Sequence, residues 1–149
     1  MSIEDDVALL ERVPTLRLLG TASLRMLAIG SEQRDVARDD LLFAIGDDAD
    51  AGFVVQRGAF QISFEDGSGA EIVAGPGALI GELALIVAMQ RPATAIALEL
   101  SSVIRIARSL FQRVLESDPA AARRLRDEFA GRTSQIASDI LMAGAKLSI

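Results

Sequence analysis

The chain has 149 residues, half of them apolar, and this size and composition predict one folded domain over residues 1–149. It contains no cysteine and no histidine, which excludes disulfides, thiolate chemistry, histidine-ligated metal sites and Ser-His catalytic pairs. The net charge of −6 disfavours nucleic acid as a partner. No apolar run reaches the roughly eighteen residues of a membrane span, and no basic segment leads an apolar run at the start. We therefore expect a cytoplasmic protein without membrane contact.

The first segment, residues 3–29, has the apolar spacing of helices, with Pro14 interrupting the run. Thr21 or Ser23 is a plausible cap for a second helix, and Gly30 is well placed to end it. We expect a pair of short helices that pack on one face of a sheet.

Between residues 31 and 107 the pattern changes to short strands separated by turns. The hairpin turn Asp66-Gly67-Ser68-Gly69 is the clearest of these turns. The strand candidates are residues 41–45, 53–57, 60–64, 70–74, 94–98 and 103–107. A count of seven or eight short strands, these six among them, separated by small turns indicates an all-β sandwich or an antiparallel jelly roll.

Helical spacing returns over residues 109–147. Ser109 is a candidate cap, and Asp118-Pro119 can end one helix and begin another, so we expect two C-terminal helices. In the last helix, apolar positions recur every three or four residues: Leu125, Phe129, Thr133, Ile136, Ile140, Ala143 and Leu147. This seam is compatible with a dimer contact and equally with packing on the chain's own barrel.

The stretch most informative about function is residues 75–97, GPGALIGELALIVAMQRPATAIA. Gly81 has no Cβ, so the backbone can approach a ligand there, and the helix-forming residues after it would present amides to an anion. Glu82 can accept hydrogen bonds from sugar hydroxyls. Arg91 offers the planar fork that fits a phosphate in two-point contact. Together these groups are suited to a phosphorylated sugar.

The motif GELALIVAMQRPAT resembles the phosphate-binding cassette of the cyclic nucleotide-binding domain family, and the resemblance extends over about residues 5–130. It implies an antiparallel β jelly roll flanked by an N-terminal helical segment and two C-terminal helices. It also implies a ligand site formed by the cassette residues Gly81, Glu82, Leu83, Ala84, Arg91, Pro92 and Ala93.

Each charged residue of this motif also has an ordinary structural interpretation. Arg91, taken alone, would be a surface arginine, but its position in the motif favours contact with the cyclic phosphate. Glu82 could simply complement the dipole of a first helical turn, whereas the resemblance implies that it binds the ribose.

Pro92 departs from the family pattern. The family residue at this position gives its backbone N–H to the cyclic phosphate, and proline has none. The loss of one donor costs about 1 kcal/mol of binding. Family members that prefer cyclic GMP tend to carry a hydroxyl here, which proline also lacks, so cyclic AMP is the expected ligand in preference to cyclic GMP.

The resemblance identifies fewer residues around the base. Phe64 aligns with an apolar base-contacting position, although it is also a candidate core residue. The cap over the base comes from the last helix in this family, which makes Phe129, Ile136 and Ile140 candidates, with core packing or a dimer contact as the alternative for each.

These features predict a regulatory module that binds a cyclic nucleotide without catalysis and signals through a shift of its C-terminal helices. No cofactor is expected. The printed chain has no attached effector, so a separate protein partner or a homodimer is expected to receive the signal. The alternative is an orphan of the same fold that has lost nucleotide binding and serves as a protein-interaction domain. A cupin-type enzyme needs histidine ligands that the chain lacks, and a DNA-binding regulator needs a basic recognition helix, also lacking.

Overall fold

Three short helices, and not the expected pair, precede the first strand. The computed structural model describes residues 2–64, 69 and 71–142, with side chains through residue 131. The helices are α1 (Ile3–Glu11), α2 (Pro14–Arg17) and α3 (Thr21–Gly30). Pro14 ends the first run but also begins α2, because the ring fixes φ at a helical value and the missing N–H is not needed in the first turn.

The ends of α3 differ from the sequence prediction. Gly20 is the N-cap, and neither Thr21 nor Ser23 caps the helix; Ser23 instead donates a hydrogen bond to Asp118 Oδ2 at 3.2 Å. Gly30 is the last helical residue and does not have a positive φ. A Cβ there would lie 2.8 Å from Leu110 Cδ1, so this glycine permits the close approach of a later helix.

The central part of the chain is an antiparallel β-roll, as predicted. Two four-stranded sheets have the strand orders β1-β10-β4-β7 and β2-β9-β5-β6, and β3 pairs with β8. The strands are β1 (Glu32–Val36), β2 (Leu41–Phe43), β3 (Asp48–Ala49), β4 (Ala51–Arg57), β5 (Phe60–Phe64), β6 (Glu71–Ala74), β7 (Leu79–Ile80), β8 (Met89–Gln90), β9 (Ala93–Ala97) and β10 (Ser101–Ala107). The strands β1, β3, β7 and β8 were not individually predicted.

The sheet that contains β4 and β10 separates two apolar cores. Successive side chains of a strand point to opposite faces. Val54, Ile104 and Ile106 therefore pack against the helices, whereas Phe53 and Val103 face the interior of the roll. This double burial explains why β4 reads as a nearly continuous apolar run.

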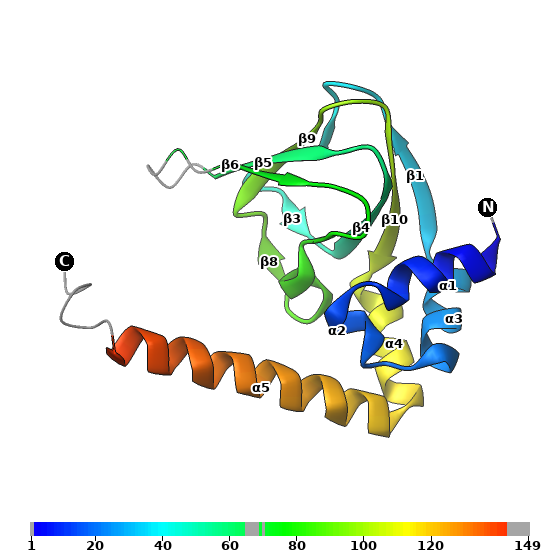
Figure 1. Cartoon of the computed structure of the whole chain (residues 1–149), viewed down its shortest axis with the longest axis vertical. Helices are drawn as coiled ribbons and strands as arrows, with labels where there is room; N and C mark the ends of the chain where they lie inside the picture. The colour runs from blue at the N-terminus through cyan, green and yellow to red at the C-terminus, as the bar shows by residue number, and fades with distance from the viewer. Residues whose placement is uncertain (1, 65–68, 70, 143–149) are drawn as a thin grey trace.

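Two helices follow the roll, α4 (Arg108–Ser117) and α5 (Pro119–Met142). Ser109 is not a cap, since Ala107 holds the N-cap position of α4. Asp118 starts α5 as predicted: its Oδ1 accepts the N–H of Ala121 at 3.1 Å. Figure 1 shows α1–α3 and α4 gathered at one side of the roll, and α5 extending from α4 beneath it.

Part of the apolar seam lies outside the described structure. Leu125 is buried against α4 and the N-terminal helices, and Phe129 packs partly on the same core. The side chains of Thr133, Ile136 and Ile140, together with Ala143 and Leu147, fall outside the described residues. Among the helices that are described, none is long and apolar enough to cross a membrane.

Candidate functional site

The cassette forms a turn, a short helix and a return strand. β7 leads into Gly81, which has φ 79° and ψ 38°, a left-handed conformation that glycine adopts without steric cost. The expected helix after it is a single 3₁₀ turn, η1 (Glu82–Leu85). The chain then passes through β8 to Arg91 and returns to the roll along β9.

A cavity of about 250 Å³ lies between the cassette and the inner face of the roll. The structure brings all eight residues named from the sequence to its wall. The lining comprises Gly81, Glu82, Leu83, Ala84, Arg91, Pro92, Ala93 and Phe64, together with Phe43, Ile62, Ile80 and Met89. That these residues bind a ligand is a prediction, whereas the structure itself places them around one cavity.

Arg91 supplies the positive charge of this cavity. Its side chain is only 5% exposed, and Nη2 donates to the carbonyl of Ala51 at 2.8 Å. The guanidinium carbon lies 4.3 Å from the ring centre of Phe43 and 5.3 Å from that of Phe53. These are cation–π distances, so two rings hold the flat cation in place.

The backbone of Arg91 is fixed by the turn that precedes β3. The Arg91 N–H donates to Asp47 O at 2.7 Å, and Arg91 O accepts from Gly46 N–H at 2.9 Å. Thr94, the hydroxyl residue of the motif, accepts the N–H of Ile45 at 2.9 Å. Thr94 therefore anchors the same turn, and it is absent from the cavity wall.

One donor of the Arg91 guanidinium is unsatisfied. The buried Nε of Arg91 has no hydrogen-bond partner among the described residues. None of the ion pairs among those residues includes Arg91. Burial lowers the pKa of the Arg91 guanidinium; Arg105 lowers it further, and Asp50 and Asp47 partly offset the effect. A buried cation with an unsatisfied donor is costly unless a negative group pairs with it.

Glu82 is connected to the N-terminal helices. Its Oε2 accepts a hydrogen bond from Thr15 Oγ1, which belongs to α2 and is 6% exposed, at 2.5 Å. A carboxylate has about four acceptor positions. The Thr15 contact therefore orients Glu82 at the cavity wall, and a carboxylate can accept hydrogen bonds from more than one donor.

Several residues around the site were not predicted from the sequence, because they belong to strands that lie about forty to fifty positions before Arg91. Phe43 and Phe53 belong to β2 and β4, and Ala51 O is set by the start of β4. Phe129, considered as a cap, lines a neighbouring groove of about 370 Å³ that shares Leu83 with the site.

The chain is similar to known proteins in sequence and in fold. The sequence model of the cyclic nucleotide-binding domain matches residues 33–118. An uncharacterised NTE family protein of Mycobacterium tuberculosis is 33% identical over an alignment of 135 residues that covers 85% of this chain and 23% of that protein. The chain thus spans about a quarter of the length of these curated relatives.

Solved structures agree with the family match. A cyclic nucleotide-binding-like protein from Brucella abortus is 36% identical, with a TM-score of 0.67 over 75% of this chain and 98% of that one. The N-terminal domain of a transcriptional regulator from Streptomyces coelicolor is 29% identical, with a TM-score of 0.80 over 89% and 94% of the two chains. The chain belongs to the cyclic nucleotide-binding domain family.

Proposed function

We propose that the chain is a non-catalytic sensor of a cyclic nucleotide, with cyclic AMP as the preferred ligand. The observation that carries the proposal is Arg91: its side chain lines the cavity, its buried guanidinium is held by two rings and one carbonyl, and its Nε has no partner among the described residues. A cyclic phosphate supplies the missing negative charge. Glu82, held on the same wall by Thr15, is positioned for the ribose hydroxyl.

The apolar part of the cavity suits a nucleobase. Phe64, Ile62 and Met89 line it and offer packing surface rather than base-specific hydrogen bonds. Pro92 is exposed at the cavity and supplies no hydroxyl or N–H there. By the family resemblance this favours cyclic AMP over cyclic GMP. The signal then passes to a protein partner or a second copy of the chain through α4 and α5.

Calorimetric titration of cyclic AMP and cyclic GMP tests this function. We expect a Kd for cyclic AMP of about 10 μM or tighter, which corresponds to about −7 kcal/mol, and weaker binding of cyclic GMP. Arg91→Met keeps the length of the side chain and removes the charge, and should weaken binding at least about tenfold. Arg91→Lys keeps the charge but loses the planar fork, so its affinity should lie between those of the wild type and Arg91→Met. Absence of binding up to millimolar nucleotide would refute the sensor.

The orphan interaction domain is the second candidate, and Pro92 is the observation in its favour. The variant Pro92→Ala restores a backbone N–H and should tighten cyclic AMP binding by roughly fivefold to tenfold, the value of one hydrogen bond. Binding by Pro92→Ala but not by the wild-type chain would show that the site was disabled at this residue. Absence of binding by both would leave the interaction domain as the remaining function.

A further inference from the structure

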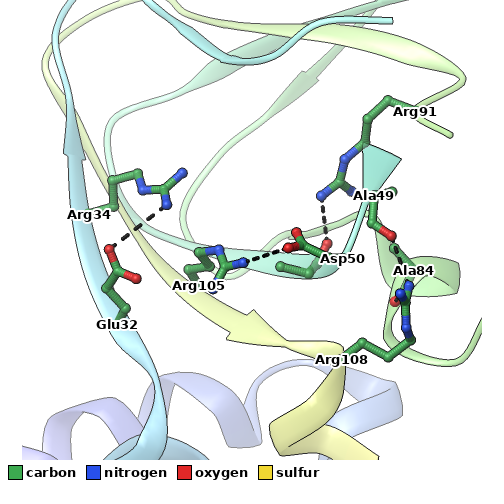
Figure 2. Close-up of polar contacts among 9 residues, drawn as sticks. Glu32, Arg34, Ala49, Asp50, Ala84, Arg91, Arg105 and Arg108 are labelled. Atoms are coloured by element: carbon green, nitrogen blue, oxygen red, sulfur yellow. Dashed lines mark hydrogen bonds and ion pairs between the residues drawn. The ribbon is translucent and has the colours of Figure 1, made fainter. Parts of the chain in front are cut away.

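Three arginines converge on the short segment Ala49–Ala51. Arg91 donates to Ala51 O, and Arg108 Nη1 donates to Ala49 O, both at 2.8 Å. Between them, Asp50 pairs with Arg105 at 3.2 Å. Figure 2 shows these side chains reaching the segment from different directions, with Arg108 rising from the start of α4.

Arg108 also contacts the cassette. Its Nη1 lies 3.2 Å from the carbonyl oxygen of Ala84 and 3.0 Å from that of Val87, at and just beyond the end of η1. Carbonyls at the end of a helical turn lack intrahelical partners, and a cation is a suitable donor to them. Nη1 carries two hydrogens, so three carbonyls share them. One side chain thus joins η1, the Ala49–Ala51 segment and α4.

The placement of Arg108 does not serve the stability of its own helix. It is the first residue of α4, and a positive charge at a helix N-terminus opposes the helix dipole. No acidic residue lies in the first turn, and the N-cap Ala107 makes no side-chain capping bond. The favourable contacts of this guanidinium are those with the cassette and with Ala49. The backbone N–H of Arg108 donates a further hydrogen bond, to Asp50 O at 2.8 Å.

We propose that Arg108 is a positioning residue that holds the cassette in its binding conformation and connects it to α4. The proposal rests on the proposed nucleotide function. Arg108 is not part of the cavity wall, so it acts by holding the carbonyl end of η1 while Gly81 and Glu82, at the other end, face the cavity. Through Ala49–Ala51 it shares a rigid support with Arg91, so a movement of Arg91 or of the cassette is transmitted to the first turn of α4.

Nucleotide affinity in matched variants tests the role of Arg108. Arg108→Met keeps an unbranched apolar stem and removes the donors; Arg108→Lys restores a donor and the charge. Arg113→Met makes the same charge change at an exposed position of α4. The affinities are measured by calorimetry well below the unfolding temperature. We expect Arg108→Met to raise the Kd for cyclic AMP at least tenfold and Arg108→Lys to raise it at most about threefold. Arg113→Met should leave the Kd unchanged. A folded Arg108→Met variant that binds like the wild type overturns the proposal, as does Arg108→Lys binding no better than Arg108→Met.

Hydrogen exchange without nucleotide separates this inference from the sensor function. The amides of Ile86 and Val87 both donate to Leu83 O at 3.0 Å. We expect them to exchange at least tenfold faster in Arg108→Met than in wild type or Arg113→Met, whether or not the chain binds cyclic AMP. Unchanged exchange would show that Arg108 does not hold η1. If Arg108→Met does not fold, Arg108→Gln is measured in the same way under the same criteria.

Discussion

The buried guanidinium of Arg91 is kept at a cost to the folded chain. Burial lowers its pKa, and a basic group whose pKa falls on folding carries a charge that opposes folding at every pH below the folded pKa, including pH 7. The residue is 5% exposed, and loss of a buried side chain usually destabilises a protein by about 0.5–3 kcal/mol. Arg91 should be an exception.

We expect Arg91→Met to change the free energy of unfolding by less than about 1 kcal/mol. The substitution removes the cost of the buried charge, and it loses one hydrogen bond to Ala51 O and the cation–π contacts with Phe43 and Phe53; these effects nearly cancel. Urea titration at pH 7 measures the difference. A destabilisation above about 2 kcal/mol would mean that Arg91 is chiefly a structural residue and would weaken its assignment to a phosphate.

Gly81 is required by two separate constraints. Its φ is +79°, and a Cβ would lie 2.5 Å from Arg91 Nη1. Gly81→Ala should therefore displace the guanidinium and weaken cyclic AMP binding at least about tenfold, in addition to roughly 1 kcal/mol of backbone strain. Gly69→Ala is the control, because Gly69 also has a positive φ but no atom of the described residues lies within 4 Å of where its Cβ would be. Equal effects of the two variants on calorimetric affinity would contradict the steric account.

At the scale of elements, short-range patterns were predictable and long-range pairing was not. The spacing of Gly81, Glu82 and Arg91 lies within one turn-and-return unit, so their common cavity followed from the sequence. The contacts of Thr15 with Glu82 and of Phe43 with Arg91 cross 67 and 48 positions, and they depend on how the strands pair. Two-residue strands such as β7 and β8 contain too few side chains to show a period.

Helix α5 contains a position where its stability can be raised. Gly131 lies inside the helix and is exposed, and no atom of the described side chains lies within 4 Å of where its Cβ would be. Gly131→Ala should stabilise the helix by about 1 kcal/mol, because alanine loses less backbone entropy. Hydrogen exchange of amides within α5 should slow by about fivefold. Faster exchange would show that the glycine serves a contact beyond the described side chains.

At the scale of the whole molecule, ligand binding and folding are linked because the two cores share one sheet. The cavity wall includes Ile62, Ile80 and Ala93 of the inner core and Ala84, whose carbonyl reaches α4 through Arg108. Occupation of the site should therefore stabilise the β-roll and the helices together, and unfolding in the presence of nucleotide should remain a single transition.

The size of this stabilisation follows from mass action. At a cyclic AMP concentration of 100 times Kd, the free energy of unfolding rises by about 2.7 kcal/mol. For a chain of this length that raises Tm by about 5–10 °C. Differential scanning calorimetry should show this shift with cyclic AMP and none with adenosine, which has the base and ribose but no phosphate for Arg91. An equal shift with adenosine, or a shift that persists in Arg91→Met, would place the binding energy in the apolar wall and not in the phosphate contact.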